Sequence, residues 1–131
     1  PGSMTPDDLA TVEKVAATYR KLIKVSCTGC AYCMPCPSGV NIPQCFSLYN
    51  DYSMGLNRMM SRGFYGLQLM GGMGTPADAS LCRNCGKCVK TCPQKIAIPE
   101  ELKNVQSTLG GLRTKIMIPF IKLMFSPKVK E

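Results

Sequence analysis

The stretch CTGCAYCMPCP at residues 27–37 places four cysteines at three-residue intervals and ends with a proline. A second stretch, CRNCGKCVKTCP at residues 82–93, also holds four cysteines before a proline, and only its last interval is one residue longer. A ninth cysteine stands alone, and the 131-residue chain has no histidine. Chains of this size bury a limited core, and small domains often depend on metals or cross-links for stability. We therefore expect the two cysteine runs to decide the fold.

The setting of the cysteines favours metal ligation over disulfides. No basic segment followed by an apolar one precedes the first run, and residues 1–3 (PGS) resemble a cloning remnant, so we expect a cytoplasmic protein. In a reducing compartment, dense cysteines indicate metal or redox sites. Structural zinc needs only four thiolates, which would leave the third and fourth cysteine of each run redundant. A thioredoxin-like site needs a preceding strand, and nothing strand-like precedes Cys27.

The second run has the spacing C-x2-C-x2-C-x3-C-P of bacterial ferredoxins, whose fourth cysteine ligates the other cluster of a two-cluster protein. Three thiolates at three-residue spacing wrap one face of a cubane, and the fourth iron must be reached from elsewhere in the chain. The sequence thus predicts two [4Fe-4S] clusters that exchange one ligand each. The first cluster would take Cys27, Cys30, Cys33 and Cys92. The second cluster would take Cys82, Cys85, Cys88 and Cys36. Cys36 is the less direct assignment, because the last interval of its run is shorter than in the pattern.

The ninth cysteine, Cys45, lies in the segment NIPQCFSLYN, which has a helical pattern. We expect it to be a small buried hydrophobic residue, since free cysteine behaves in this way in most cores. The alternative is a substitute ligand or a reactive thiol.

Helical patterns fill most of the remaining chain. The segment TPDD at residues 5–8 combines a capping hydroxyl, a proline and two acids, and it predicts an amphipathic helix to about residue 24. Further helices are expected from about residue 41, over 53–70 with interrupting glycines, and over 98–108. The 45 residues between Cys36 and Cys82 resemble the long helical connector of the α-helical ferredoxin fold of succinate dehydrogenase iron-sulfur subunits. We therefore expect an all-α fold, a small ferredoxin-like bundle built around the two clusters.

A more specific resemblance covers residues from about 5 to 105. The segments CTGCAYCMPCPSGVNIP and ADASLCRNCGKCVKTCPQKIAIPEEL resemble the C-terminal ferredoxin-like domain of the iron-sulfur branch of the aldo/keto reductases. The leading segment EKVAATYRKLIKVSCTGC resembles the helix that connects the barrel of those enzymes to their clusters. In that family the catalytic residues lie in an N-terminal (β/α)8 barrel, which these 131 residues do not contain. No catalytic residue is therefore assigned in this chain.

These patterns predict three segments and one function. Residues 1–26 would hold the remnant and a linker helix, residues 27–105 the dicluster domain, and residues 106–131 a basic and apolar tail. The expected function is electron transfer as part of a larger aldo/keto reductase-like oxidoreductase. The alternative is an interaction module, held together by zinc or by clusters, without a redox role.

Charge indicates the kind of partner. The formal net charge of +8 falls to roughly +4 once two oxidised clusters of roughly 2− each are counted. Lys87, Lys90 and Lys95 surround the second run, so an acidic redox protein is the expected partner. Nucleic acid is not expected, because aromatic residues are few and no recognition module is present. The tail is expected to cover the core or dock to a partner, with contact to a membrane surface as the less favoured alternative.

Overall fold

The computed structural model describes residues 3–55 and 57–125, and within these residues it contains helices and no strand. The prediction of an all-α fold is confirmed. The elements, in chain order, are α1 (Pro6–Leu22), α2 (Ile42–Ser53), α3 (Arg58–Phe64), the π-helical turn η1 (Tyr65–Leu69), the 3-10 turn η2 (Ala79–Leu81), α4 (Lys87–Thr91), α5 (Ile98–Leu109) and α6 (Leu112–Phe125). No helix in this part of the chain has the length and apolar character needed to cross a bilayer.

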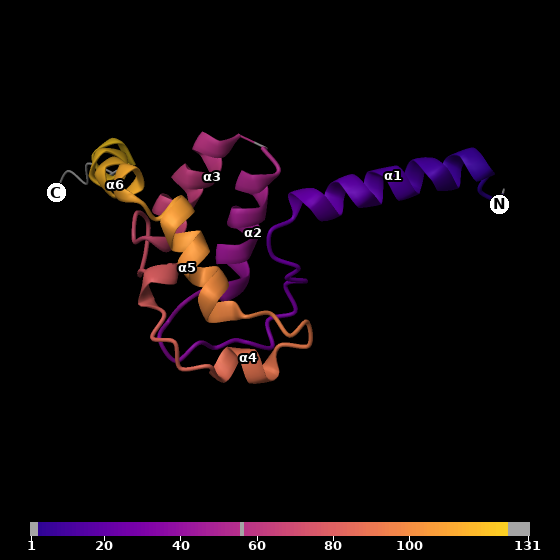
Figure 1. The fold of residues 1–131 in the computed structure, drawn as a ribbon. Helices are drawn as coiled ribbons and strands as arrows, with labels where there is room; N and C mark the ends of the chain where they lie inside the picture. The colour runs from indigo at the N-terminus through magenta and orange to yellow at the C-terminus, as the bar shows by residue number, and fades with distance from the viewer. Residues whose placement is uncertain (1–2, 56, 126–131) are drawn as a thin grey trace.

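The core lies between α2, η1 and α5. Helix α2 buries Ile42, Cys45 and Phe46 against Leu102 and Val105 of α5. Further buried apolar residues lie in the coil between α1 and α2, in η1 and η2, and at the two ends of α5, namely Val25, Val40, Tyr65, Leu69, Ala79, Ile98 and Leu109. Burial of this apolar surface drives the folding of the bundle. Figure 1 shows both cysteine segments toward the lower end of the bundle, the first as the coil that descends from α1 and passes beneath α2, and the second as the chain around α4.

Helix α1 begins as the sequence predicts. Thr5 and Asp8 form a reciprocal cap, in which the Asp8 carboxylate accepts from the Thr5 N–H at 2.9 Å and the Thr5 hydroxyl accepts from the Asp8 N–H at 3.2 Å. The helix ends at Leu22, close to the expected end, and none of its residues is buried. Figure 1 shows it extending away from the bundle.

The glycines between residues 53 and 70 have different effects. Gly55 adopts a φ of +78°, and Asn57 with a φ of +71° caps α3, so the chain turns between α2 and α3. Gly63 and Gly66 lie inside α3 and η1, and the helical path continues through both. A Cβ on Gly66 would lie 3.1 Å from Cγ2 of Thr114, so Gly66 allows α6 to pack closely on η1. The expected interruption is therefore confined to Gly55.

Candidate metal centre

The first cysteine run lies in a coil between α1 and α2. A turn in which the Met34 N–H donates to the Ala31 carbonyl at 2.9 Å curls the middle of the run, and Ala31 adopts a φ of +60°. A second turn joins the Gly39 N–H to the Cys36 carbonyl at 2.9 Å. A left-handed conformation is unfavourable for alanine, so tertiary structure imposes this curl.

The coil that leads into the first run is fixed to α2 by Asn50. The buried Asn50 side chain accepts from the backbone N–H groups of Lys24 and Val25, at 3.0 Å each, and donates to the Val25 carbonyl at 2.8 Å. The polar groups of this extended segment are thereby satisfied without a sheet. Cys27 follows two residues later, so its position depends on this attachment.

The second cysteine run is fixed by Tyr65 and by its own short helix. The Tyr65 hydroxyl accepts from the Ala79 N–H at 3.0 Å and donates to Oε1 of Gln106 at 3.2 Å, which ties η2 to η1 and α5. Beyond Cys85, Gly86 with a φ of +72° leads into α4, which carries Cys88. Cys92 follows directly after the last residue of α4.

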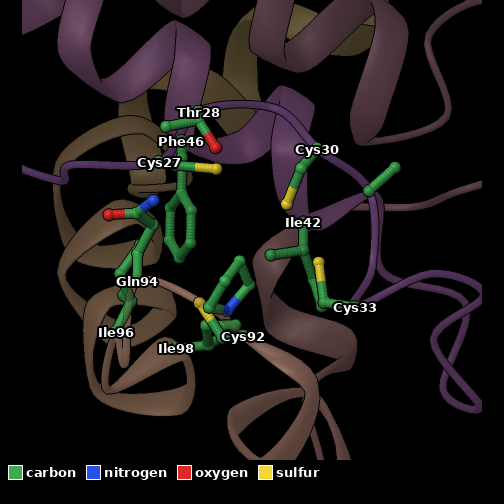
Figure 2. Close-up of a pocket in the computed structure, with 12 residues that line it drawn as sticks. Cys27, Thr28, Cys30, Cys33, Ile42, Phe46, Cys92, Gln94, Ile96 and Ile98 are labelled. Carbon is green, nitrogen blue, oxygen red and sulfur yellow. The ribbon is translucent and has the colours of Figure 1, made fainter.

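Four thiols from the two distant runs line one pocket. Cys27, Cys30 and Cys33 come from the first run and Cys92 comes from the second. Figure 2 shows the four sulfur atoms surrounding the same space. The rest of the lining includes the apolar side chains of Ile42, Phe46, Ile96 and Ile98, together with Thr28, Ala31, Pro93 and Gln94.

Of the remaining four thiols, Cys36, Cys82 and Cys85 each lie near Cys88. Burial raises the pKa of the Cys88 thiol, and the charges of Cys82, Cys36 and Cys85 raise it further. Burial also raises the pKa of Cys33, with added effects from Cys27, Cys88 and Cys30. Cys88 therefore lies near both groups of thiols. Cys30 and Cys85 are the two exposed members of the eight, and the other six are partly buried.

The cysteine thiols are suited to a cluster and not to a single metal ion. All nine cysteines are free thiols. Within residues 3–55 and 57–125, no three cysteine, aspartate, glutamate or histidine side chains converge closely enough to hold a single metal ion. A cubane has its four irons at separate corners and takes thiolates that are spread around it. Four thiols around one apolar pocket fit such a cluster.

Cys45 lies apart from these thiols. It is fully buried in the core on α2, beside Tyr65, and burial raises its pKa from 9.0 to about 12. A thiol with this pKa is neutral and unreactive at physiological pH. The interpretation of Cys45 as a small buried hydrophobic residue is confirmed.

The surface around the second run carries basic charge. Arg83, Lys87, Lys90 and Lys95 are exposed, and residues 79–99 contain no acidic residue. Lys87, Lys90 and Lys95 were expected around this run from the sequence, whereas Arg83 was not. Asn50, Tyr65 and the apolar lining of the pocket were not expected either, because their side chains are separated along the chain and show no motif.

Comparison with known proteins gives one match. The family model described as a 4Fe-4S dicluster domain matches residues 26–98, which is more than half of the chain and includes both cysteine runs. No curated protein and no solved structure matches.

Proposed function

The chain belongs to the family of 4Fe-4S dicluster domains and binds two such clusters, and we propose that it relays single electrons between an acidic redox protein and an aldo/keto reductase-like oxidoreductase. We assign the first cluster to Cys27, Cys30, Cys33 and Cys92. We assign the second cluster to Cys82, Cys85, Cys88 and Cys36. On this proposal residues 27–105 form the electron-transfer unit, and the protein works in a reducing cytoplasm.

The observation that supports this ligation most strongly is the position of Cys92. It belongs to the second run, yet it lines the same pocket as Cys27 and Cys30. A cysteine placed after a short helix, and followed by a proline, cannot easily fold back to the cluster of its own run. The exchange of one ligand per cluster therefore accounts for the spacing of the second run as well as for the pocket.

Rapid transfer between the clusters follows from their proximity. Cys33 and Cys88 would ligate different cubanes. They are close enough that the charge of Cys88 contributes to the raised pKa of Cys33. When bound, each cubane would supply one-electron chemistry, with no bond made or broken in the protein. The residues of this chain hold the clusters, and the apolar wall of Ile42 and Phe46 limits access of water, which influences the reduction potential.

The link to a reductase rests on the resemblance of the cysteine segments and of the helix before them. Helix α1 extends from the bundle and buries none of its residues. Its exposed apolar stripe of Leu9, Val12 and Tyr19 fits the role of a connector that packs on a second domain or subunit.

The ligation is tested by comparing single Cys→Ser variants, purified and reconstituted without oxygen. The parent should contain about eight iron and eight sulfide per chain, and both clusters should reduce reversibly in a potentiometric titration followed by electron paramagnetic resonance. C92S should lose the same cluster signal as C27S. C36S should lose the same signal as C82S. C45S is the matched control and should keep both signals.

Two outcomes contradict the proposal in different ways. If C92S matches C82S, each run ligates its own cluster and the ligand exchange is wrong. If the anaerobic parent contains zinc, lacks sulfide and takes up no electrons, the chain is a structural module and the electron-transfer role is wrong.

A further inference from the structure

A second pocket lies beside the first cysteine run, at the place where α1 meets α2. Figure 1 shows the C-terminal end of α1 close to α2. We call it the α1–α2 pocket, and its lining includes Tyr19, Cys27, Thr28, Ser47, Asp51 and Met54. Cys27 also lines the pocket that fits the first cluster. A group bound in the α1–α2 pocket therefore lies next to a proposed ligand of that cluster.

Asp51 gives the α1–α2 pocket a negative charge that the fold itself does not explain. It is the only acidic residue between Glu13 and Asp78. It is half-buried in the last turn of α2, where a carboxylate opposes the helix dipole and lowers the stability of the helix. Among the described residues, no lysine or arginine lines the pocket, although Arg20 and Lys24 flank it in the sequence. The carboxylate is thus available to a cation from outside the chain.

The other side chains of the pocket suit a flat organic cation. Tyr19 offers an aromatic ring, and Met54 offers a polarisable thioether. A guanidinium group is planar, stacks on aromatic rings and pairs with a carboxylate through two parallel hydrogen bonds. It is also less strongly hydrated than an ammonium group, so it enters a half-buried pocket more readily. The lining therefore favours arginine over lysine and disfavours an anion.

The second cluster has a pocket of the opposite charge. This pocket borders Cys82, and its lining includes Lys103 and, among the residues that the structure describes, no aspartate or glutamate. The exposed lysines of α4 lie on the same cysteine run. The two proposed clusters are thus accompanied by different charges, an acid beside the first and basic side chains beside the second.

We propose that the α1–α2 pocket receives an arginine side chain of the oxidoreductase that exchanges electrons with the first cluster. This inference rests on the proposed function, because it specifies how one of the two redox partners is recognised. The acidic redox protein is attracted to the basic surface at the second cluster instead. Opposite charges at the two positions disfavour binding of each partner at the position of the other.

The binding test uses N-acetylarginine amide as the probe and the neutral, isosteric N-acetylcitrulline amide as its control, at constant ionic strength. The anaerobically purified full chain, with both clusters oxidised, carries isotopically labelled methionine methyl groups, and M54L identifies the Met54 resonance. We expect this resonance to shift saturably with the arginine probe and not with the citrulline probe. D51N should weaken binding by about fivefold or more, and Y19L should weaken it as well. E13Q removes an acidic charge of α1 outside the pocket lining and should bind like the parent.

The electron-transfer test follows reduction of the first cluster by the methyl viologen radical, a planar organic cation, with rapid-freeze electron paramagnetic resonance. D51N should slow this reduction by about threefold, and E13Q should leave the rate unchanged. Y32L is a second control, because Tyr32 is an exposed aromatic residue of the first run, at 68%, that lies outside the pocket lining. It should be reduced at the rate of the parent.

Helical circular dichroism and iron content show whether each variant retains its fold and clusters. D51N should not lower the unfolding midpoint, because the carboxylate opposes the dipole of α2. Equal binding of the two probes, or equal binding by the parent and D51N, would overturn the inference and leave the electron-transfer proposal intact. If the arginine probe binds as expected but neither cluster is reduced reversibly, the electron-transfer proposal is wrong and the pocket is not a redox contact.

Discussion

Asn50 shows how one polar side chain fixes the entry to a cofactor loop. Its amide satisfies three backbone groups of Lys24 and Val25 inside the bundle. Leucine at this position would fill a similar volume and leave two N–H groups and a carbonyl without partners. Groups that lose their partners in a buried setting cost more than the hydrogen bonds themselves contributed.

We expect N50L to destabilise the holoprotein by about 2 to 4 kcal/mol and to speed the loss of the first cluster. The measurement is anaerobic thermal unfolding, followed by helical circular dichroism and by cluster absorbance. N104L is the control, since Asn104 is exposed on α5, and it should change stability by less than about 0.5 kcal/mol. Equal effects of the two substitutions would mean that the Asn50 hydrogen bonds contribute nothing particular.

Cys45 makes stability depend on alkaline pH. Its pKa of about 12 in the fold lies above its ordinary value of 9.0, so the unfolded chain releases this proton first. Its contribution to stability is complete below about pH 9 and is lost as the pH rises toward 12. Burial also raises the pKa of Tyr65, which adds a loss above about pH 10.

The comparison that checks this prediction is denaturant unfolding of the parent and C45A between pH 7 and pH 11. The parent should lose stability more steeply above pH 9, while C45A should retain only the later loss from Tyr65. Parallel pH profiles would contradict the assigned role of Cys45.

At the residue scale, the sequence predicts the cluster-ligating cysteines better than the residues that hold the cysteine segments in place. The eight clustered cysteines could be identified because ligand spacing is a local property of the chain. Asn50 and Tyr65 could not, since their partners lie 25 and 14 residues or more away and no periodicity marks them. Cys45 could be assigned from its helical, apolar neighbours.

At the scale of elements, Gly63 and Gly66 can be compared directly, because both are helical glycines and only one of them is packed against another helix. Both lie within a continuous helical path, but a Cβ on Gly63 meets nothing within 4 Å, whereas one on Gly66 would press on Thr114 and Ile118 of α6. A single glycine therefore sets how closely α6 approaches η1. The sequence marked both glycines as interruptions, because their packing partners are not visible in a local window.

We expect G66V to destabilise the protein by about 1 to 3 kcal/mol through overpacking. G63A should be neutral or stabilise by up to about 1 kcal/mol, because alanine loses less backbone entropy in a helix. Unfolding midpoints measured under the same anaerobic conditions check both. Stabilisation by both substitutions would show that α6 does not pack against Gly66.

The short helix α4 is the element expected to meet the redox partner. Lys87 and Lys90 are exposed on it, directly beside Cys88. Complementary charge mainly raises association rates, and salt screens this effect. The sequence indicated this surface from composition, although it did not predict the helix, which has only five residues.

We expect K87E/K90E to slow electron transfer from a reduced acidic flavodoxin by about tenfold at low salt, with the difference vanishing at high salt. Stopped-flow absorbance of the clusters gives the rate. K115E on α6 carries half the charge change at the far end of the bundle and should have little effect. A rate that is equally slowed by K115E would mean that net charge, and not this surface, controls the encounter.

At the scale of the whole molecule, the helical core and the cysteine segments are held in different ways. Helices α2 and α5 bury side chains against each other, whereas the chain at 23–41 and 82–97 is mostly coil around the thiols. The long connector between the runs was enough to predict a helical bundle. The direction of α1 and the path of α6 could not be predicted, since an apolar stripe does not say which surface covers it.

We expect removal of the clusters by oxidation and chelation to release the coils before the bundle. Hydrogen exchange followed by mass spectrometry should show loss of amide protection at 23–41 and 82–97, with more protection retained in α2 and α5. Uniform loss across the domain would mean that the clusters, and not the apolar core, hold the bundle together.

Cys30 and Cys85 are the two exposed thiols of the eight, and each would ligate a different cubane. On the proposed ligation each cluster would have its own contact with solvent, so a donor and an acceptor would not compete for one position. A domain of this kind could bind its electron donor and its electron acceptor at the same time, without releasing one protein before it binds the other. Steady-state kinetics with such a ternary complex would give intersecting double-reciprocal plots. A carrier that releases its donor before it binds its acceptor would give parallel plots.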